Sequence, residues 1–241
     1  MFKRQWIVFG ALFATVTAHA SLRDWNTATD CYFGRLAPGD AHASFTLAIR
    51  GGNNGNQKRS GDLGSYAILL DGWQVVGDAG SARSVPRFRD CQQKLGSAFY
   101  SQMMYKEFTP DRDTLIYDLT PAYCRPKVYE VVRTFTYDRR ERSVMVEDYV
   151  DTKSAFFETA LVFGKDARIE KGTDPLHFVL KDEKSGRRAA VAIAGSSENK
   201  IGVTVAAEDI VEGEAKVGTR LVIRFAAEIE RGAITVTTTA L

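Results

Sequence analysis

The sequence predicts an all-β fold, a large antiparallel β-sandwich that includes one short helix. From Thr114 to Thr239, short runs rich in β-branched and aromatic residues alternate with turn-forming residues at regular spacing. Two further runs flank Asp71-Gly72, a dipeptide typical of the two-residue turn of a β-hairpin. No linker, composition break or convincing repeat follows residue 20. We therefore expect one domain over residues 21–241, since all-β domains of roughly 220 residues are common.

Residues 1–20 have the parts of a secretory signal peptide. Lys3 and Arg4 supply the positive start, and residues 6–16 are almost wholly apolar. Ala18-His19-Ala20 places small residues at the two positions that a signal peptidase reads. The apolar stretch is short for a bilayer span, so an uncleaved anchor is the weaker alternative. We expect cleavage after Ala20, a periplasmic or secreted location, and no membrane association of the mature chain.

The first half of the mature chain has the highest density of turn-forming residues. Residues 51–61 form a long polar loop rich in Asn and Gly, which tolerate positive φ. A hairpin of strands Tyr66–Leu70 and Trp73–Val76 is expected after it. The one helix is expected over Ser84–Gly96, with Pro86 near its start and Gly96 as its stop. The flanking segments are an irregular start (21–40), a first strand (Ser44–Arg50) and an aromatic stretch of ambiguous period (Phe99–Phe108).

The second half of the chain is predicted to be almost entirely strand. The longest strand, Lys127–Tyr137, places Val131, Arg133 and Phe135 on one face. A charged turn, Asp138–Glu141, leads into the next strand, which pairs back on it. The other expected strands are Thr114–Leu119, Arg142–Val150, Ala155–Phe163, Leu176–Leu180, Arg188–Ala194, Ile201–Ala207, Thr219–Ala227 and Ala233–Thr239.

The charge balance argues against a nucleic-acid-binding protein. The full chain has 32 basic and 30 acidic residues, and residues 1–20 contain two basic and no acidic ones. The mature chain therefore has 30 of each and is neutral overall, whereas affinity for nucleic acid depends on excess basic charge. A local basic patch that binds an acidic sugar remains compatible with this balance.

The three cysteines, Cys31, Cys91 and Cys124, allow one disulfide and one free thiol in an exported protein. The sequence does not choose the pair, and the spacing fits no zinc motif. The mature chain has two histidines, His42 and His177. Neither lies in a nucleophile or metal motif.

Four motifs follow one another between Phe45 and Gly80: Gly51-Gly52-Asn53-Asn54, Asp62-Leu63-Gly64-Ser65-Tyr66, Asp71-Gly72 and Asp78-Ala79-Gly80. In order and spacing they resemble the C-terminal β-sandwich of heparinase II/III-like polysaccharide lyases. The stretches Tyr117–Cys124 and Arg133–Val150 resemble later strands of the same family, so the resemblance spans Ser44 to Phe163.

The resemblance implies a metal site whose ligands are largely missing here. Family members hold a structural metal with a His of a His-Asn-His-Asn-Asp cluster, the Asp of Asp-x-Gly, and a later His. Lys58 and Ser60 stand at the two His positions of the cluster, and Tyr100 stands where the later His should be. Asp78 remains, but zinc generally needs three or four protein ligands. We therefore predict no bound metal and no cofactor.

The family's lyases also carry a large helical toroid before the sandwich, and substrate binds between the two. The toroid supplies most of the catalytic Tyr, His and Asn residues. The segment ahead of Ser44 is too short to form one. The resemblance therefore implies no catalytic residue in this chain, and catalysis would need a partner chain that carries a toroid.

The central loop and its neighbours supply groups suited to an acidic sugar. Arginine recognises a carboxylate in a bidentate manner, and Tyr commonly serves as acid or base in β-elimination. Each group also has a purely structural interpretation: a solvated basic pair, a turn cap for Asp78, a core position for Tyr66. The candidate substrate-binding residues are Lys58, Arg59, Asp62, Tyr66, Asp78 and Tyr100.

Three functions of different classes follow. The first is a non-catalytic or accessory module that binds acidic, uronic-acid polysaccharide. The second is an active lyase, a carbon–oxygen lyase acting by β-elimination with a toroid from a partner chain. The third is a structural or assembly protein of the cell envelope. We favour the first, because the scaffold motifs persist while the His ligands do not.

Overall fold

The computed structural model describes residues 22–36, 44–55, 61–123 and 127–241. These residues form 19 strands and one 3-10 turn, so the all-β prediction is confirmed. None of the described residues forms a helix long and apolar enough to cross a membrane. The strands are β1 (Arg23–Asn26), β2 (Cys31–Arg35), β3 (Phe45–Ile49), β4 (Asn53–Asn54), β5 (Tyr66–Leu70), β6 (Trp73–Val76), β7 (Arg87–Phe88), β8 (Gly96–Tyr100), β9 (Gln102–Phe108), β10 (Arg112–Asp118), β11 (Val128–Asp138), β12 (Ser143–Ala155), β13 (Phe157–Gly164), β14 (Ala167–Lys171), β15 (His177–Asp182), β16 (Arg188–Ser197), β17 (Val203–Glu212), β18 (Ala215–Phe225) and β19 (Ile229–Ala240); the 3-10 turn is η1 (Thr120–Ala122).

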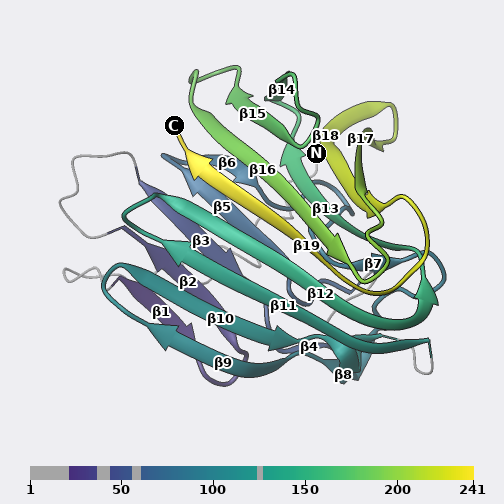
Figure 1. Ribbon diagram of the computed structural model, residues 1–241. Helices are drawn as coiled ribbons and strands as arrows, with labels where there is room; N and C mark the ends of the chain where they lie inside the picture. The colour runs from purple at the N-terminus through teal and green to yellow at the C-terminus, as the bar shows by residue number, and fades with distance from the viewer. Residues whose placement is uncertain (1–21, 37–43, 56–60, 124–126) are drawn as a thin grey trace.

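Two antiparallel sheets form the body of the sandwich (Figure 1). The larger has the strand order β14-β15-β16-β19-β12-β11-β10-β9, and the five-stranded sheet β1-β2-β3-β5-β6 lies behind it. Aromatic pairs join the two across the core: Phe45 lies 6.0 Å from Tyr137 and Tyr66 lies 5.5 Å from Phe135, measured between ring centroids. Burial of this apolar surface is the main stabilising contribution to such a fold.

A four-stranded sheet, β17-β18-β13-β7, extends the molecule on one side, and a short pair, β4-β8, completes the set. The rings of Phe157, Phe88 and Phe225 pack together beneath this sheet. Its first strand in the chain, β7, is only two residues long and pairs with β13 through Phe88↔Phe157 and Arg87↔Glu158. The sheet therefore joins a segment near residue 87 to strands far along the chain.

The hairpin at Asp71-Gly72 is confirmed. Strands β5 and β6 have the predicted bounds and pair directly across the turn, Leu70 opposite Trp73. Asp71 has φ 49° and Gly72 has φ 79°, the pair of positive values that a type I′ turn requires. The strands expected after residue 114 are also present, most of them longer at one end than predicted.

The helix predicted over Ser84–Gly96 is wrong. The segment is extended at β7, irregular up to Gly96, and Ser84 Oγ accepts a hydrogen bond from the Val162 N–H at 3.0 Å. Pairing of β7 with β13 explains the difference, because tertiary contacts override a weak local preference for helix. Among the described residues, η1 is the only helical element.

The irregular start predicted for residues 21–40 is also wrong where it is described. Strands β1 and β2 form a hairpin that adds to the five-stranded sheet. The buried carboxylate of Asp113 on β10 accepts hydrogen bonds from Arg23, Tyr32 and Arg139. These long-range bonds hold short strands whose own sequence carries little alternation.

The cysteines differ in state. Cys91 is disulfide-bonded, whereas Cys31 has a free thiol that is partly exposed. Cys124 lies outside the described residues. The backbone of Cys91 also forms an isolated antiparallel β-bridge with Phe88, which closes the short turn after β7.

One buried ion pair connects the sheets to the loops. Arg133 on β11 is 1% exposed, and its guanidinium donates to both carboxylate oxygens of Asp148 on β12, at 2.6 and 2.7 Å. Nη1 also donates to the carbonyl oxygens of Gly64 and Ser84, both at 2.6 Å. Nη2 donates to Thr159 Oγ1 on β13 at 3.1 Å. All five N–H donors of the guanidinium are therefore satisfied.

Asp148→Asn removes one charge of this pair with little change in shape. We expect it to lower the free energy of unfolding by about 3 to 5 kcal/mol, because it leaves a buried guanidinium without its counter-ion. Asp151→Asn, on the same strand, is the matched control: its partner Arg231 is 54% exposed, so we expect a loss within about 1 kcal/mol. Urea unfolding of both variants measures the difference. Equal losses of unfolding free energy in the two variants would contradict the structural role given to the Arg133–Asp148 pair.

Candidate functional site

Two predicted residues, Asp62 and Asp78, come together in a cluster with two arginines. Arg50 Nε lies 3.5 Å from Asp62 Oδ2, and Arg83 Nε lies 3.3 Å from Asp78 Oδ2. The negative charge of Asp62 also raises the pKa of Asp78, and the positive charge of Arg83 lowers the pKa of Asp62. The cluster is therefore two carboxylates balanced by two guanidiniums.

Burial makes the two carboxylates unusually basic. Desolvation raises the pKa of Asp78 to about 6, against the opposing charge of Arg83 and with a further upward contribution from Asp62. Desolvation likewise raises the pKa of Asp62, opposed by Arg50 and Arg83. The Oδ1 atoms of both residues are buried and accept no hydrogen bond from the described part of the chain. Such oxygens can accept a proton or a donor group of a ligand.

The described residues contain no group of three or more His, Cys, Asp and Glu side chains placed to hold a metal ion. Within the cluster, two carboxylates face two arginines, whose fixed charges oppose a cation. That the protein binds no metal stays a prediction.

The other candidate residues lie elsewhere. Tyr66 on β5 is 3% exposed, and Arg133 lies 5.5 Å from its ring centroid. Burial raises the pKa of its hydroxyl far above the usual value, which disfavours a role as a base. Tyr100 on β8 is 44% exposed and pairs with Asn53 of β4. Lys58 and Arg59 lie outside the described residues.

Gln93 fixes the loop that carries Asp62. Its side-chain nitrogen donates to the Leu63 carbonyl at 2.8 Å, and its side-chain oxygen accepts from the Leu63 N–H at 3.0 Å. Asn54, fully buried, donates to the Lys94 carbonyl at 2.8 Å. These bonds join Asn54 and Leu63 to the segment around residues 92–94.

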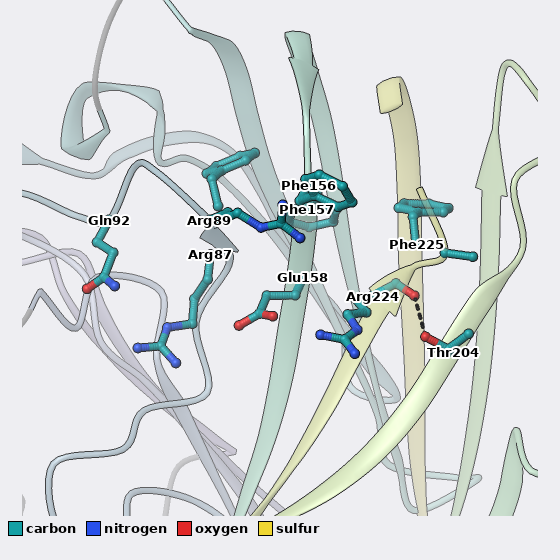
Figure 2. Close-up of a pocket in the computed structure, with 11 residues that line it drawn as sticks. Arg87, Arg89, Gln92, Phe156, Phe157, Glu158, Thr204, Arg224 and Phe225 are labelled. Atoms are coloured by element: carbon teal, nitrogen blue, oxygen red, sulfur yellow. Dashed lines mark hydrogen bonds between the residues drawn. The ribbon is translucent and has the colours of Figure 1, made fainter. Parts of the chain in front are cut away.

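A pocket lies beside this segment, along the strands of the four-stranded sheet (Figure 2). Its volume is about 530 Å³. Four of its side chains form a row across the strands, since the register pairs Thr204 with Arg224, Arg224 with Glu158, and Glu158 with Arg87. The lining residues are Arg87, Phe88, Arg89, Gln92, Phe156, Phe157, Glu158, Thr204, Arg224, Phe225 and Ala226.

Positive charge is in excess in this arginine pocket. The lining contains three arginines, Arg87, Arg89 and Arg224, and one carboxylate, Glu158. None of these four side chains forms an ion pair with any described residue. Burial lowers the pKa of Arg87, as does the charge of Arg220, while Glu158 raises it. The Arg89 guanidinium stacks 3.5 Å from the ring centroid of Phe156. Such planar, uncompensated guanidiniums suit carboxylate or sulfate groups.

A smaller hollow of about 30 Å³ lies between residues of the pocket and of the carboxylate cluster. Arg83, a member of the cluster, lines it together with Arg87 and Gln92, which also line the pocket. Arg83, Arg87 and Arg89 therefore all line one or other of the two hollows. Sequence reasoning missed them, although three arginines within seven residues were a visible signal. No local signal connects Glu158 or Arg224 to them.

The pKa of Asp78 gives a pH test. The protonated Asp78 side chain stabilises the fold at pH values below 3.8, the pKa of Asp in the unfolded chain. This stabilisation is lost as the pH rises through about 6, the pKa of Asp78 in the folded protein. We expect Asp78→Asn to unfold with a free energy about 1 to 2 kcal/mol higher than the parent at pH 7, and to lose this advantage near pH 4. This is below the full linkage value because 29% of the side chain is exposed.

The matched control is Asp182→Asn. Despite burial, hydrogen bonds from Ser185 and from backbone N–H groups hold the pKa of Asp182 low, so this variant should lose stability at pH 7. Thermal unfolding of both variants between pH 4 and 7 measures whether each substitution raises or lowers the stability. An Asp78→Asn variant that is less stable than the parent at pH 7 would refute the account of this cluster.

Comparison with known proteins finds no matching family model and no matching curated relative. Solved structures do match. The heparan sulfate lyase HepC from Pedobacter heparinus has a TM-score of 0.73 at 11% identity, over 96% of this chain and 38% of that one. The heparinase III BT4657 gene product has a TM-score of 0.72 at 10% identity, over 94% and 37%. The chain therefore has the β-sandwich fold found within heparinase III lyases and spans about 38% of their length.

Proposed function

We propose that this chain is an exported, polysaccharide-lyase-related sandwich module that binds acidic polysaccharide without cleaving it. The observation that carries the proposal is the arginine pocket. Three guanidiniums without carboxylate partners lie around a pocket of about 530 Å³. The structural neighbours supply the polysaccharide context, since one of them is a heparan sulfate lyase.

The chemistry of the pocket favours recognition of an anionic sugar. Arg87 and Arg224 flank Glu158, and Arg89 lies across Phe156 (Figure 2). A carboxylate or sulfate can accept two parallel N–H bonds from one guanidinium, which gives orientation as well as affinity. The strength of such contacts falls with salt, because the pocket is open to solvent.

The same residues lack the groups that β-elimination needs. That reaction requires a base for the proton beside the carboxylate and an acid for the leaving oxygen. Arginine stays protonated and is a poor base, and the pocket lining contains no Tyr or His. Tyr66 is buried and its pKa is raised, so it is also unsuited. We therefore favour binding over catalysis.

An active lyase assembled with a partner chain is the second candidate. One observation favours it: the fold of 96% of this chain matches part of a heparan sulfate lyase. Ultraviolet absorbance of an unsaturated product distinguishes the two. Product formation by this chain, alone or with a toroid-bearing partner, would favour the lyase and reject a purely non-catalytic role.

The binding prediction concerns the triple variant Arg87→Ala, Arg89→Ala, Arg224→Ala. We expect its affinity for anionic polymers such as heparan sulfate or polygalacturonate to fall at least about 10-fold, since contacts between charged groups are each worth ~1.5 kcal/mol or more. The matched control removes three exposed, ion-paired arginines elsewhere: Arg112, Arg140 and Arg231. Isothermal titration at two salt concentrations measures both.

A loss of affinity confined to the pocket variant supports the proposal. Equal losses in both variants would assign binding to overall charge, and no binding of the parent protein to any anionic polymer would reject the function. Far-ultraviolet circular dichroism checks that both variants retain their strands.

Export makes a separate prediction about the mature amino terminus. The Leu22 carbonyl accepts hydrogen bonds from the Arg35 N–H at 3.0 Å and from Arg139 at 3.1 Å, so residue 22 is already part of the fold. We expect a signal peptidase to cut just before this point. The mass of the protein recovered from the periplasm or medium should correspond to residues 21–241. A full-length mass in the cytoplasmic fraction would contradict export.

A further inference from the structure

Glu158 occupies the middle of the arginine pocket. The strand register sets it directly opposite Arg87 of β7 on one side and Arg224 of β18 on the other. Figure 2 shows its carboxylate between the two arginine side chains. The three residues belong to the same row of the sheet as Thr204, whose hydroxyl donates to the Arg224 carbonyl at 3.4 Å.

The carboxylate of Glu158 does not neutralise its neighbours. It forms no ion pair with either arginine, or with any other described residue. Four residues from Arg224 on β18, Arg220 forms a salt bridge with its cross-strand partner Glu208 of β17. The sheet therefore contains one Arg–Glu pair joined by a salt bridge and one Arg–Glu–Arg row without a salt bridge, which we call the open row. Of the two, the open row alone lines the pocket.

An open row places opposite demands on a ligand. The guanidiniums favour an anionic group, which can accept two N–H bonds at once. The carboxylate between them favours a hydrogen-bond donor and repels a second anion nearby. A sugar with one acidic group beside free hydroxyl groups meets both demands. A sugar with sulfate groups on neighbouring positions places an anion against Glu158.

We infer that Glu158 is a specificity-determining residue that selects sugars with one acidic group per residue over polysulfated ones. This inference rests on the proposed function, because it concerns the ligand of the same pocket. Glu158 leaves binding possible, since three cations against one anion keep the pocket positive.

The test compares Glu158→Gln with the parent on two polymers. Polygalacturonate carries one carboxylate per sugar with free hydroxyl groups, and dextran sulfate carries several sulfates per sugar. We expect Glu158→Gln to raise affinity for dextran sulfate about 10-fold while affinity for polygalacturonate stays level or falls, the scale of one charge–charge contact open to solvent. Glu158→Ala should shift the ratio in the same direction.

The matched control is Glu170→Gln on β14, which changes the net charge equally but removes a partner of Arg188 and Lys181 in the eight-stranded sheet. It should leave the ratio of the two affinities within about 3-fold of the parent value, since exposed ion pairs contribute little. If Glu158→Gln and Glu170→Gln change the ratio equally, or Glu158→Gln leaves it unchanged, the inference fails while the proposed function stands. If the parent protein binds neither polymer, the proposed function fails, and this inference with it.

Discussion

The buried pair of Arg133 and Asp148 is the constraint on which the rest of the structure depends. A guanidinium with 1% exposure is tolerated only if every donor is satisfied, and two of the partners are loop carbonyls, those of Gly64 and Ser84. Gly64 has φ 74°, and a Cβ there would lie 2.8 Å from a methyl group of Leu119. The loops are therefore held in one arrangement by an interaction that belongs to the core.

That arrangement places the side chains of the carboxylate cluster and of the arginine pocket. Asp62 and Arg83 lie just before the two carbonyls that Arg133 binds, so the carboxylate cluster forms where the loops are fixed. From Ser84 the chain runs extended along β13 to Arg87 and is tied back by Gln93, whose amide binds Leu63. The backbone that carries the arginine pocket is thus held by hydrogen bonds, although the lining residues come from loop and sheet alike. A held backbone favours binding, because little backbone order must be gained when a ligand arrives.

Local patterns in the sequence predicted what is local in the structure. Alternation with a period of two located the later strands, and Asp71-Gly72 located a turn whose φ angles need those residues. The same alternation placed Arg133 on the inner face, but nothing local named Asp148 as its partner. Strands β1 and β2 depend on Asp113, and the segment after Ser84 depends on pairing with β13, so both were mispredicted. The row from Arg87 to Thr204 joins four strands whose register no single stretch encodes, and the pocket was therefore missed.

The most direct test of the central claim observes the arginine Nε–Hε groups by nuclear magnetic resonance while an acidic oligosaccharide is added. The account predicts saturable shifts for Arg87, Arg89 and Arg224, with the signal of the buried Arg133 unchanged. Shifts confined to exposed arginines outside the pocket, or no saturable shift at all, would contradict the claim that this pocket binds acidic polysaccharide.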